Sequence, residues 1–264
     1  MGASTINGRA ALVVAHPGHE LQVYGWLEAA RPCAFVLSDG SGRGGRPRLA
    51  ATTKILDRVG ASRGTLYGRL SEVEIYRAVL NHDFGVFVGL ARELADALVR
   101  LRVDYVAGDA GEGYNSTHDL CRLVTNAAVA MAGRERDAEI GNFDFTLSAA
   151  SGLCPEGLRE RAVWLHLDDE TFGRKLAAAR AYPGLAAEVE AALATHRPES
   201  FRVECLRPVE SGPAEDFCGG GRPYYEEHGE RQVAAGHFEQ VIRYRRHVLP
   251  VADALRRAVS ARGR

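Results

Sequence analysis

The sequence predicts an α/β fold with a Rossmann-like, mostly parallel sheet and helices on both faces. Three observations lead to this prediction. Short, unbroken apolar runs occur at residues 10–15, 33–37 and 103–107, as is typical of strands buried on both faces of a sheet. Between them lie longer segments whose apolar residues recur at helical spacing. Strands that alternate with helices in this way indicate a doubly wound sheet.

Each element of the first half can be placed from its own pattern. Gly60 should close one of the helices, because glycine readily adopts the left-handed conformation that ends a helix. The strand tips are followed by turn-forming residues, among them Pro17-Gly18 and Asp39-Gly40. We expect strands at residues 10–15, 33–37, 65–67 and 103–107, and helices at 20–30, 49–59, 72–80, 84–100 and 118–131.

The second half is less regular. Pro183-Gly184 interrupts one helical stretch, and Pro250 is expected to kink or split the last helix. Neither repeats nor a long linker divide the chain, so residues 1–264 are expected to form a single domain with 211–264 as a C-terminal loop and helix extension. We expect strands at 162–167 and 201–206, one or two helices across 172–193, a loop at 211–223 and a last helix at about 237–259.

Composition narrows the classes of partner and compartment. The 33 Lys and Arg residues balance 34 Asp and Glu residues, so no overall field would steer the protein to nucleic acid or to a membrane surface. No apolar stretch has the length of a signal peptide or a membrane-spanning helix. The five scattered cysteines form no C-x-x-C pair, which favours a reducing compartment. We therefore expect a cytoplasmic protein that acts on a small molecule, with a homo-oligomer left open.

Three histidines lie where a metal could bind. His16 and His19 flank a Pro-Gly turn at the end of the first strand, and His118 opens a helix after the strand at 103–107. Ligands of such sheets bind outside the carboxyl ends of the strands. Each histidine alone is more often a core or surface residue. Three imidazoles at two strand ends, however, match a catalytic zinc site that keeps a position open for water, so the sequence predicts Zn²⁺ or another divalent metal there.

Two motifs resemble those of PIG-L/LmbE-type N-deacetylases. LVVAHPGHE at 12–20 resembles the family's A-H-P-D-D-E signature, and GYNSTHDL at 113–120 resembles its second metal motif, H-P-D-H or N-P-D-H. The glycine-rich segment 37–42 and the helices at 48–60 and 175–182 also fit, so the resemblance covers most of the first two-thirds of the chain. It implies a metal-dependent enzyme that removes N-acetyl groups, often from amino sugars, with zinc polarising the amide carbonyl and activating water.

The resemblance also implies roles for individual residues. His16 matches the first metal ligand, His19 stands where the family has a metal-binding aspartate, and His118 matches the last metal histidine. Asn115 stands where many members have a histidine that supports the oxyanion, and an asparagine can still donate a hydrogen bond there. Gly18 replaces the aspartate that usually serves as general base, and an aspartate installed there would restore a base if the backbone allowed it.

Other departures suggest that the acid/base groups are partly removed. Thr117 replaces the aspartate of the second motif, and Ala51 stands where a glutamate usually follows Arg48. Asp109 and Glu112, in the loop that leads to His118, are the candidate replacement bases. Arg48, within a basic segment after the second strand, is a candidate contact for an anionic part of the substrate.

Three further acidic residues near these motifs have structural interpretations. Glu20 is expected to stabilise the ligand turn and the following helix, and Asp119 to favour a helix N-terminus. Asp39 is expected to organise its glycine-rich loop or to hold a ligand imidazole.

The segment 223–230, PYYEEHGE, allows two interpretations. It could fold back over the metal-bearing strand ends, with Tyr225, Glu226 and His228 as substrate contacts, or form a surface turn.

Three functions remain open at this stage. The first is a zinc-dependent hydrolase, an N-deacetylase or amidase, that acts on a small polar metabolite, with an amino sugar as one option. The second keeps the metal but carries out a different reaction, because three neutral ligands leave more positive charge on the ion. The third is a non-catalytic binding protein, which the loss of the carboxylate at Gly18 favours and the three imidazoles disfavour.

Overall fold

The computed structural model describes residues 7–42, 45–209 and 221–261. Within them, seven strands form one sheet in the order β3-β2-β1-β4-β5-β7-β6. The first five strands in the chain run parallel, β7 pairs antiparallel with β5, and β6 pairs antiparallel with β7. The predicted α/β class with a mostly parallel sheet is confirmed. The strands are β1 Ala10–Val14, β2 Cys33–Ser38, β3 Ser62–Leu70, β4 Tyr105–Asp109, β5 Gly141–Phe145, β6 Val163–His166 and β7 Val203–Pro208.

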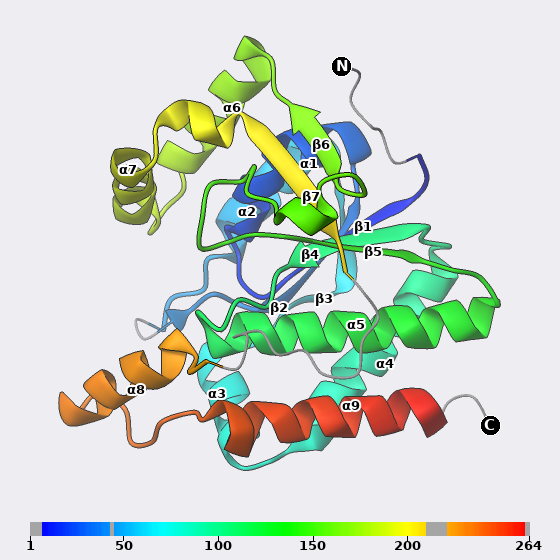
Figure 1. The fold of residues 1–264 in the computed structure, drawn as a ribbon, viewed down its shortest axis with the longest axis vertical. Helices are drawn as coiled ribbons and strands as arrows, with labels where there is room; N and C mark the ends of the chain where they lie inside the picture. The colour runs from blue at the N-terminus through cyan, green and yellow to red at the C-terminus, as the bar shows by residue number, and fades with distance from the viewer. Residues whose placement is uncertain (1–6, 43–44, 210–220, 262–264) are drawn as a thin grey trace.

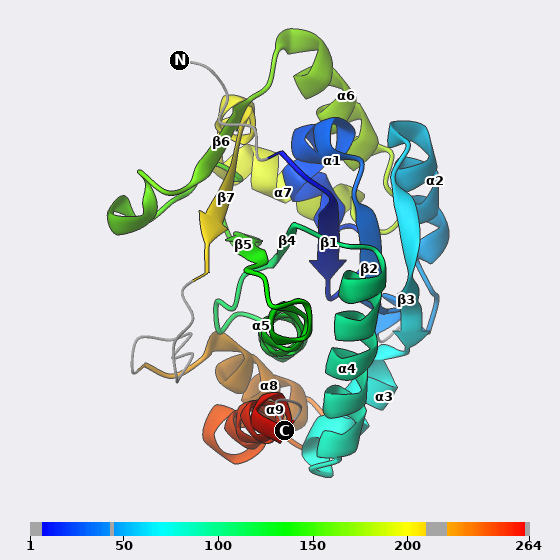
Figure 2. The ribbon, with the colours of Figure 1, turned by 90° about the vertical axis from the view of Figure 1, so that its right-hand side faces the viewer.

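Helices cover both faces of the sheet (Figures 1 and 2). Alternate side chains of β1 explain why this strand is apolar throughout: Ala11 and Val13 join the core on the side of α4 and α5, whereas Leu12 and Val14 join the core on the side of α1 and α2. One face carries α1 Tyr24–Ala30, α2 Leu49–Val59, α6 Asp169–Arg180 and α7 Ala186–Thr195, and the other carries α3 Glu72–Leu80, α4 Phe84–Arg100, α5 Ser116–Arg136 and α9 Leu249–Ala261.

The strand order creates a crevice at one point of the sheet. The chain winds outward from β1 through β2 to β3, then returns to place β4 on the other side of β1. The loops after β1 and β4 therefore leave the carboxyl edge in opposite directions, which is where ligands of such folds bind. His16 follows β1, and the segment 109–118 follows β4.

Most predicted boundaries in the first half agree with the structure. Helix α2 ends at Gly60, which has the expected left-handed conformation with φ 73°. Helix α3 begins with a capping box in which Ser71 and Glu74 satisfy each other's backbone N–H groups. One difference is that a 3₁₀ helix, η1 His19–Val23, precedes α1 where a single helix was expected.

Two strands were predicted incompletely because they are not buried on both faces. Strand β3 spans nine residues rather than the expected three, and as an edge strand it has mostly exposed or half-exposed side chains. Strand β5, with the sequence GNFDF, was not predicted at all, since four of its five residues are only half-buried and two of them are polar. Apolar sequence patterns identify buried strands, so strands with exposed side chains are missed.

The C-terminal part required correction. The segment 223–230, interpreted as a cap over the site or as a surface turn, lies in helix α8 Tyr224–Ala234 except for Pro223. The last helix begins later than expected, with a π-helical turn, η5 Tyr244–Val248, that leads into α9. Pro250 lies just after this change of helix type, in the first turn of α9, where a missing N–H is tolerated. Most of the expected loop at 211–223 lies outside the described residues.

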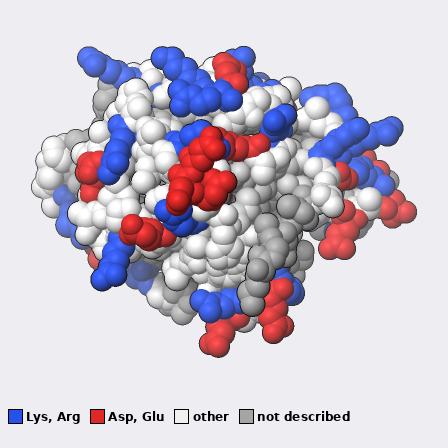
Figure 3. Space-filling model, turned by 90° about the horizontal axis from the view of Figure 1, so that it is seen from above, with Lys and Arg blue, Asp and Glu red and all other residues white. Residues whose placement is uncertain are grey.

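The surface agrees with the balanced composition. On the face seen in Figure 3, basic and acidic side chains are interspersed rather than separated into patches. In the described part of the chain, no helix is both long and apolar enough to cross a membrane.

A buried ion pair joins the two halves of the chain. Lys175 of α6 and Glu204 of β7 are both buried, with 2.8 Å between Nζ and Oε1. Glu204 also accepts hydrogen bonds from the backbone N–H groups of Gly25 (2.9 Å) and Trp26 (2.8 Å) at the start of α1. Lys175 donates in addition to the carbonyl of Gln22 in η1, at 2.8 Å. The pair therefore fixes α6 against the segment that follows the first two histidines.

Removing one partner of this pair should be costly. We expect Lys175→Met to lower the free energy of unfolding by about 3–5 kcal/mol, because it leaves Glu204 buried without a cation. The double variant Lys175→Met/Glu204→Gln should recover much of the loss. Urea unfolding measures both, with Arg180→Met, which breaks the exposed pair with Glu190, as the matched control expected to change little. Equal losses for the two single variants would contradict the assignment.

Candidate metal centre

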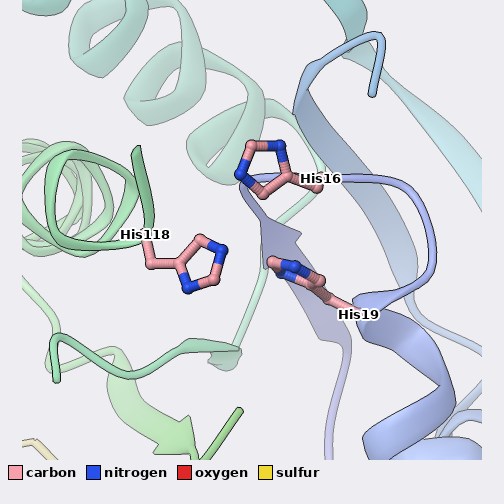
Figure 4. Close-up of side chains that lie close together, drawn as sticks. All are labelled: His16, His19 and His118. Atoms are coloured by element: carbon pink, nitrogen blue, oxygen red, sulfur yellow. The ribbon is translucent and has the colours of Figure 1, made fainter. Parts of the chain in front are cut away.

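Three imidazole rings converge at the crevice between β1 and β4. His16 follows β1, His19 begins η1, and His118 lies in the first turn of α5 (Figure 4). The ring centroids of His16 lie 5.1 Å from those of both His19 and His118, and the His19 and His118 centroids are 4.7 Å apart. One ring nitrogen from each residue falls within 4.8 Å of the others. The structure thus brings together the three residues that the sequence singled out as metal ligands.

The turn between His16 and His19 depends on glycine. Gly18 has φ 109°, which residues with a Cβ rarely adopt, and a Cβ there would lie 2.5 Å from Leu185 Cδ1. The N–H of Gly18 donates to Glu20 Oε2 at 2.8 Å. Burial raises the pKa of the fully buried Glu20, despite the hydrogen bonds that its carboxyl group accepts. Glu20 therefore stabilises the turn, in agreement with its expected role.

His19 is oriented by Asp109 at the end of β4. The Nδ1 of His19 lies 2.8 Å from Asp109 Oδ2, and the same oxygen accepts the backbone N–H of Ala15 at 2.7 Å. Asp109 is fully buried. With Nδ1 donating to the carboxylate, Nε2 of His19 is the nitrogen that can bind a metal. The geometry therefore makes Asp109 a hydrogen-bond partner of His19, whereas the sequence suggested a base.

His16 has a carboxylate partner that the sequence analysis missed. Its Nδ1 lies 2.5 Å from Glu72 Oε1, and Ser38 Oγ donates to the same oxygen at 2.6 Å. Burial alone would raise the pKa of Glu72, but the hydrogen bond and charge of His16 help to bring it below its ordinary value. The sequence does contain a feature that could have identified Glu72. The Ser71 capping box starts α3 directly after β3, so Glu72 lies at the same edge of the sheet as His16.

The low pKa of His118 suits a metal ligand. Burial lowers the pKa of His118 well below its ordinary value, and the nearby His19 and His16 lower it further. A neutral imidazole is the form that binds metals. In addition, Nε2 of His16 is buried and makes no hydrogen bond to any described residue. A neutral His118, an unpartnered buried nitrogen on His16 and two supporting carboxylates fit a divalent ion such as zinc.

The other two predicted residues of the segment 109–118, Glu112 and Asn115, form hydrogen bonds that hold nearby backbone in place. Glu112 accepts from Thr146 Oγ1 at 2.5 Å through one oxygen and from the N–H groups of Leu147 and Ser148 through the other. Asn115 caps α5, because its Oδ1 accepts the N–H of Thr117 at 2.8 Å, which leaves only its amide nitrogen to donate. Glu112 is therefore a poor candidate for a base, and Asn115 keeps its potential as a donor.

Two further aspartates hold loops. Asp119 accepts the N–H groups of Glu112 and Gly113, both at 3.1 Å, and its burial raises its pKa to about 7. Asp39 accepts the N–H of Ser41 at 2.8 Å, so it organises the glycine-rich loop. Of the two roles considered for Asp39, orienting an imidazole belongs instead to Glu72.

A cavity of about 330 Å³ opens beside His19 and His118. Arg48 lines it, as its proposed contact with substrate requires, and donates through Nε to the carbonyl of Gly40 at 2.9 Å. Tyr114 also lines it, from the loop before α5, and its ring stacks on that of Tyr224 with centroids 5.1 Å apart.

Three residues of the tail that were predicted as substrate contacts do not line this cavity. Tyr225 is buried in the core on the α5 side of the sheet. Glu226 accepts from the N–H of Tyr244 at 2.8 Å and pairs with Arg243 at 3.2 Å, so it fastens α8 to the next segment. The ring of His228 lies beside Tyr224. The tail therefore reaches the rim of the cavity through Tyr224 rather than through the predicted residues.

Among known proteins, the chain resembles two solved structures at low sequence identity. No protein-family model and no curated protein matches the chain. The zinc-inhibited form of teicoplanin deacetylase Orf2 is 13% identical with a TM-score of 0.49. A deacetylase triple mutant of the teicoplanin biosynthetic pathway is 11% identical with a TM-score of 0.44. Both alignments cover 79% of this chain and 99% of the other.

The backbone should reject an aspartate at position 18. We expect Gly18→Asp to destabilise the protein, because the left-handed backbone costs about 1–3 kcal/mol for such a residue and its Cβ would overlap Leu185. Gly173→Asp, on an open face of α6, is the matched control. Urea unfolding compares the two, and a fully stable Gly18→Asp protein would show that the turn does not require glycine.

The carboxylate behind His19 should support metal affinity. We expect Asp109→Asn to weaken metal binding by about 10–100-fold, the usual effect of removing such a partner. Chelator competition measures the affinity. Asp39→Asn, in a neighbouring loop without contact to an imidazole, is the control and should bind as the parent does. Unchanged affinity in Asp109→Asn would mean that His19 does not bind through Nε2.

Proposed function

We propose that the protein is a metal-dependent amide hydrolase that removes an N-acyl group from a small polar metabolite, with an N-acylated amino sugar as the leading candidate. One observation carries the proposal. Three imidazoles converge at the carboxyl edge of a parallel sheet, and two of them are held by carboxylates that leave the second ring nitrogen available. The motifs around His16 and His118, which resemble those of PIG-L/LmbE-type N-deacetylases, support the same function.

The residues of the site would have separate roles in this reaction. A divalent metal bound by the three histidines would polarise the amide carbonyl and make a water molecule more acidic. Asn115 would donate from its amide nitrogen to the oxygen that gains charge during the reaction. Asp109 and Glu72 would act as positioning residues, since each contacts an imidazole rather than the cavity. Because all three proposed ligands are neutral, they leave the charge of the ion uncompensated, which lessens the need for a strong base.

A second candidate function is a binding protein without catalysis. The observation that favours it is at Gly18, where the side chain that would act as base is absent and Leu185 packs against the space. Such a protein would keep the metal and the cavity but leave the amide intact. Activity measurements on the metal-loaded protein separate the two functions.

The purified protein should contain about one divalent metal ion per chain, most readily zinc. We expect His16→Ala, His19→Ala and His118→Ala each to lose most of it, because each removes one of three ligands. His237→Ala, an exposed histidine elsewhere, is the control. Elemental analysis after reconstitution provides the measurement. A parent protein that takes up no metal would contradict the proposal.

Hydrolysis is tested with N-acylated amino sugars and release of the free amine as the readout. The metal-loaded parent should release amine, and the chelated protein and the histidine variants should not. Metal uptake without hydrolysis of any substrate in the series would favour the binding protein.

A further inference from the structure

The cavity beside the candidate metal centre has an apolar wall. It opens from His19 and His118 and is bounded by η1, the loop after β5, α6 and α7. Most of its remaining lining is aliphatic or aromatic, and six of these side chains form a wall in which Leu21 is buried and the other five are half-buried. The residues that define the wall are Leu21, Leu147, Leu176, Leu185, Val189 and Phe201.

Few polar groups line this wall, and two of them already bind other groups of the protein. The amine of Lys175 is held in the buried ion pair. The Nε of Arg48 donates to the carbonyl of Gly40. Gln22 and Glu188 also border the cavity. The space next to the imidazoles therefore favours an apolar group.

The size of the cavity exceeds what an acetyl group needs. Its volume is about 330 Å³, whereas one water molecule occupies roughly 30 Å³ of the liquid. An acetyl group offers a single methyl group to such a space. An aliphatic chain of several methylenes would fill it and displace water from the apolar wall.

The amine part of the substrate could contact a different surface, which is formed by two tyrosine rings. Tyr114, which lines the cavity, stacks nearly parallel on Tyr224 at an interplanar angle of 4°, and both side chains are exposed. Flat rings with polar tips suit a sugar ring. With the scissile carbonyl at the imidazoles, the acyl chain and the polar amine can then occupy separate surfaces.

We infer that the substrate is an amide of a medium-length aliphatic acid, whose acyl chain lies in the cavity bounded by Leu176 and Leu185. This inference rests on the proposed hydrolase function and names its substrate class. Gly18 takes part in the selection, because the absence of a Cβ allows Leu185 to pack beside the turn that carries His19. The glycine that removes a base thus also extends the apolar wall to the metal centre.

The test compares N-acyl glucosamines with acetyl, hexanoyl and decanoyl chains. We expect kcat/KM to rise by about fourfold for each methylene added until the cavity is full. Leu176→Trp should abolish this preference by filling the cavity, and Leu153→Trp, at an exposed leucine outside it, should leave the preference unchanged. A parent that hydrolyses the acetyl substrate best, with no gain from longer chains, would overturn the inference and leave the proposed hydrolase intact.

A binding measurement separates the two proposals. Calorimetry with acetate, hexanoate and decanoate, below the concentration at which they aggregate, should show affinity that increases with chain length. Leu176→Trp should lose this trend, and thermal unfolding should confirm that the variant is folded. Binding that increases with chain length without hydrolysis of any substrate would support the apolar chain site and overturn the hydrolase. Equal binding of all three acids by the parent would overturn the chain site.

Discussion

The hydrogen bond between His19 and Asp109 is the interaction on which the arrangement of the site depends. Asp109 ends β4, and its Oδ2 holds both the ring of His19 and the N–H of Ala15, the residue after β1. One oxygen therefore ties two neighbouring strands to the ligand turn. The parallel register of β1 and β4 places the carboxylate at this height, and His16 receives the same support from Glu72 across β2 and β3. The end of β4 and the start of α3, rather than loops, thus set the orientation of the His19 and His16 imidazoles.

Gly18 shows how one residue can satisfy several constraints at once. Its left-handed backbone forms the turn, its N–H is held by Glu20, and its missing side chain leaves room for Leu185. The sequence alone presents it as a lost base. In the structure it is a position where a carboxylate would be strained, so on the proposed function the protein must hydrolyse its substrate with a different division of acid and base roles.

The sequence allowed the central strands and the three histidines to be predicted because both depend on local signals. Strands β1, β2 and β4 are buried on both faces, and each histidine lies within a few residues of a strand end or helix start. Glu72 was missed because its partner, His16, is 56 residues away in the sequence, and their contact depends on the order of strands β1, β2 and β3 in the sheet. Strand β5 escaped because its side chains are half-exposed, and Tyr225 was misplaced because the sequence did not reveal that α8 is a helix. Half-exposed elements and contacts between distant segments therefore both limited the prediction.

The buried pair of Lys175 and Glu204 has a consequence for how substrate preference can change. Lys175 binds both Glu204 and the carbonyl of Gln22, so α6 is fixed to the same segment that carries His19. On the proposed function, the fold then fixes how far the apolar cavity extends from the metal centre. Related proteins with a different chain-length preference would differ in the bulk of residues such as Leu176 and Val189, while the helices that carry them stay in register. In α6, the stabilising Lys175 and the cavity-lining Leu176 are thus separate residues, so chain-length preference can change without loss of the buried pair.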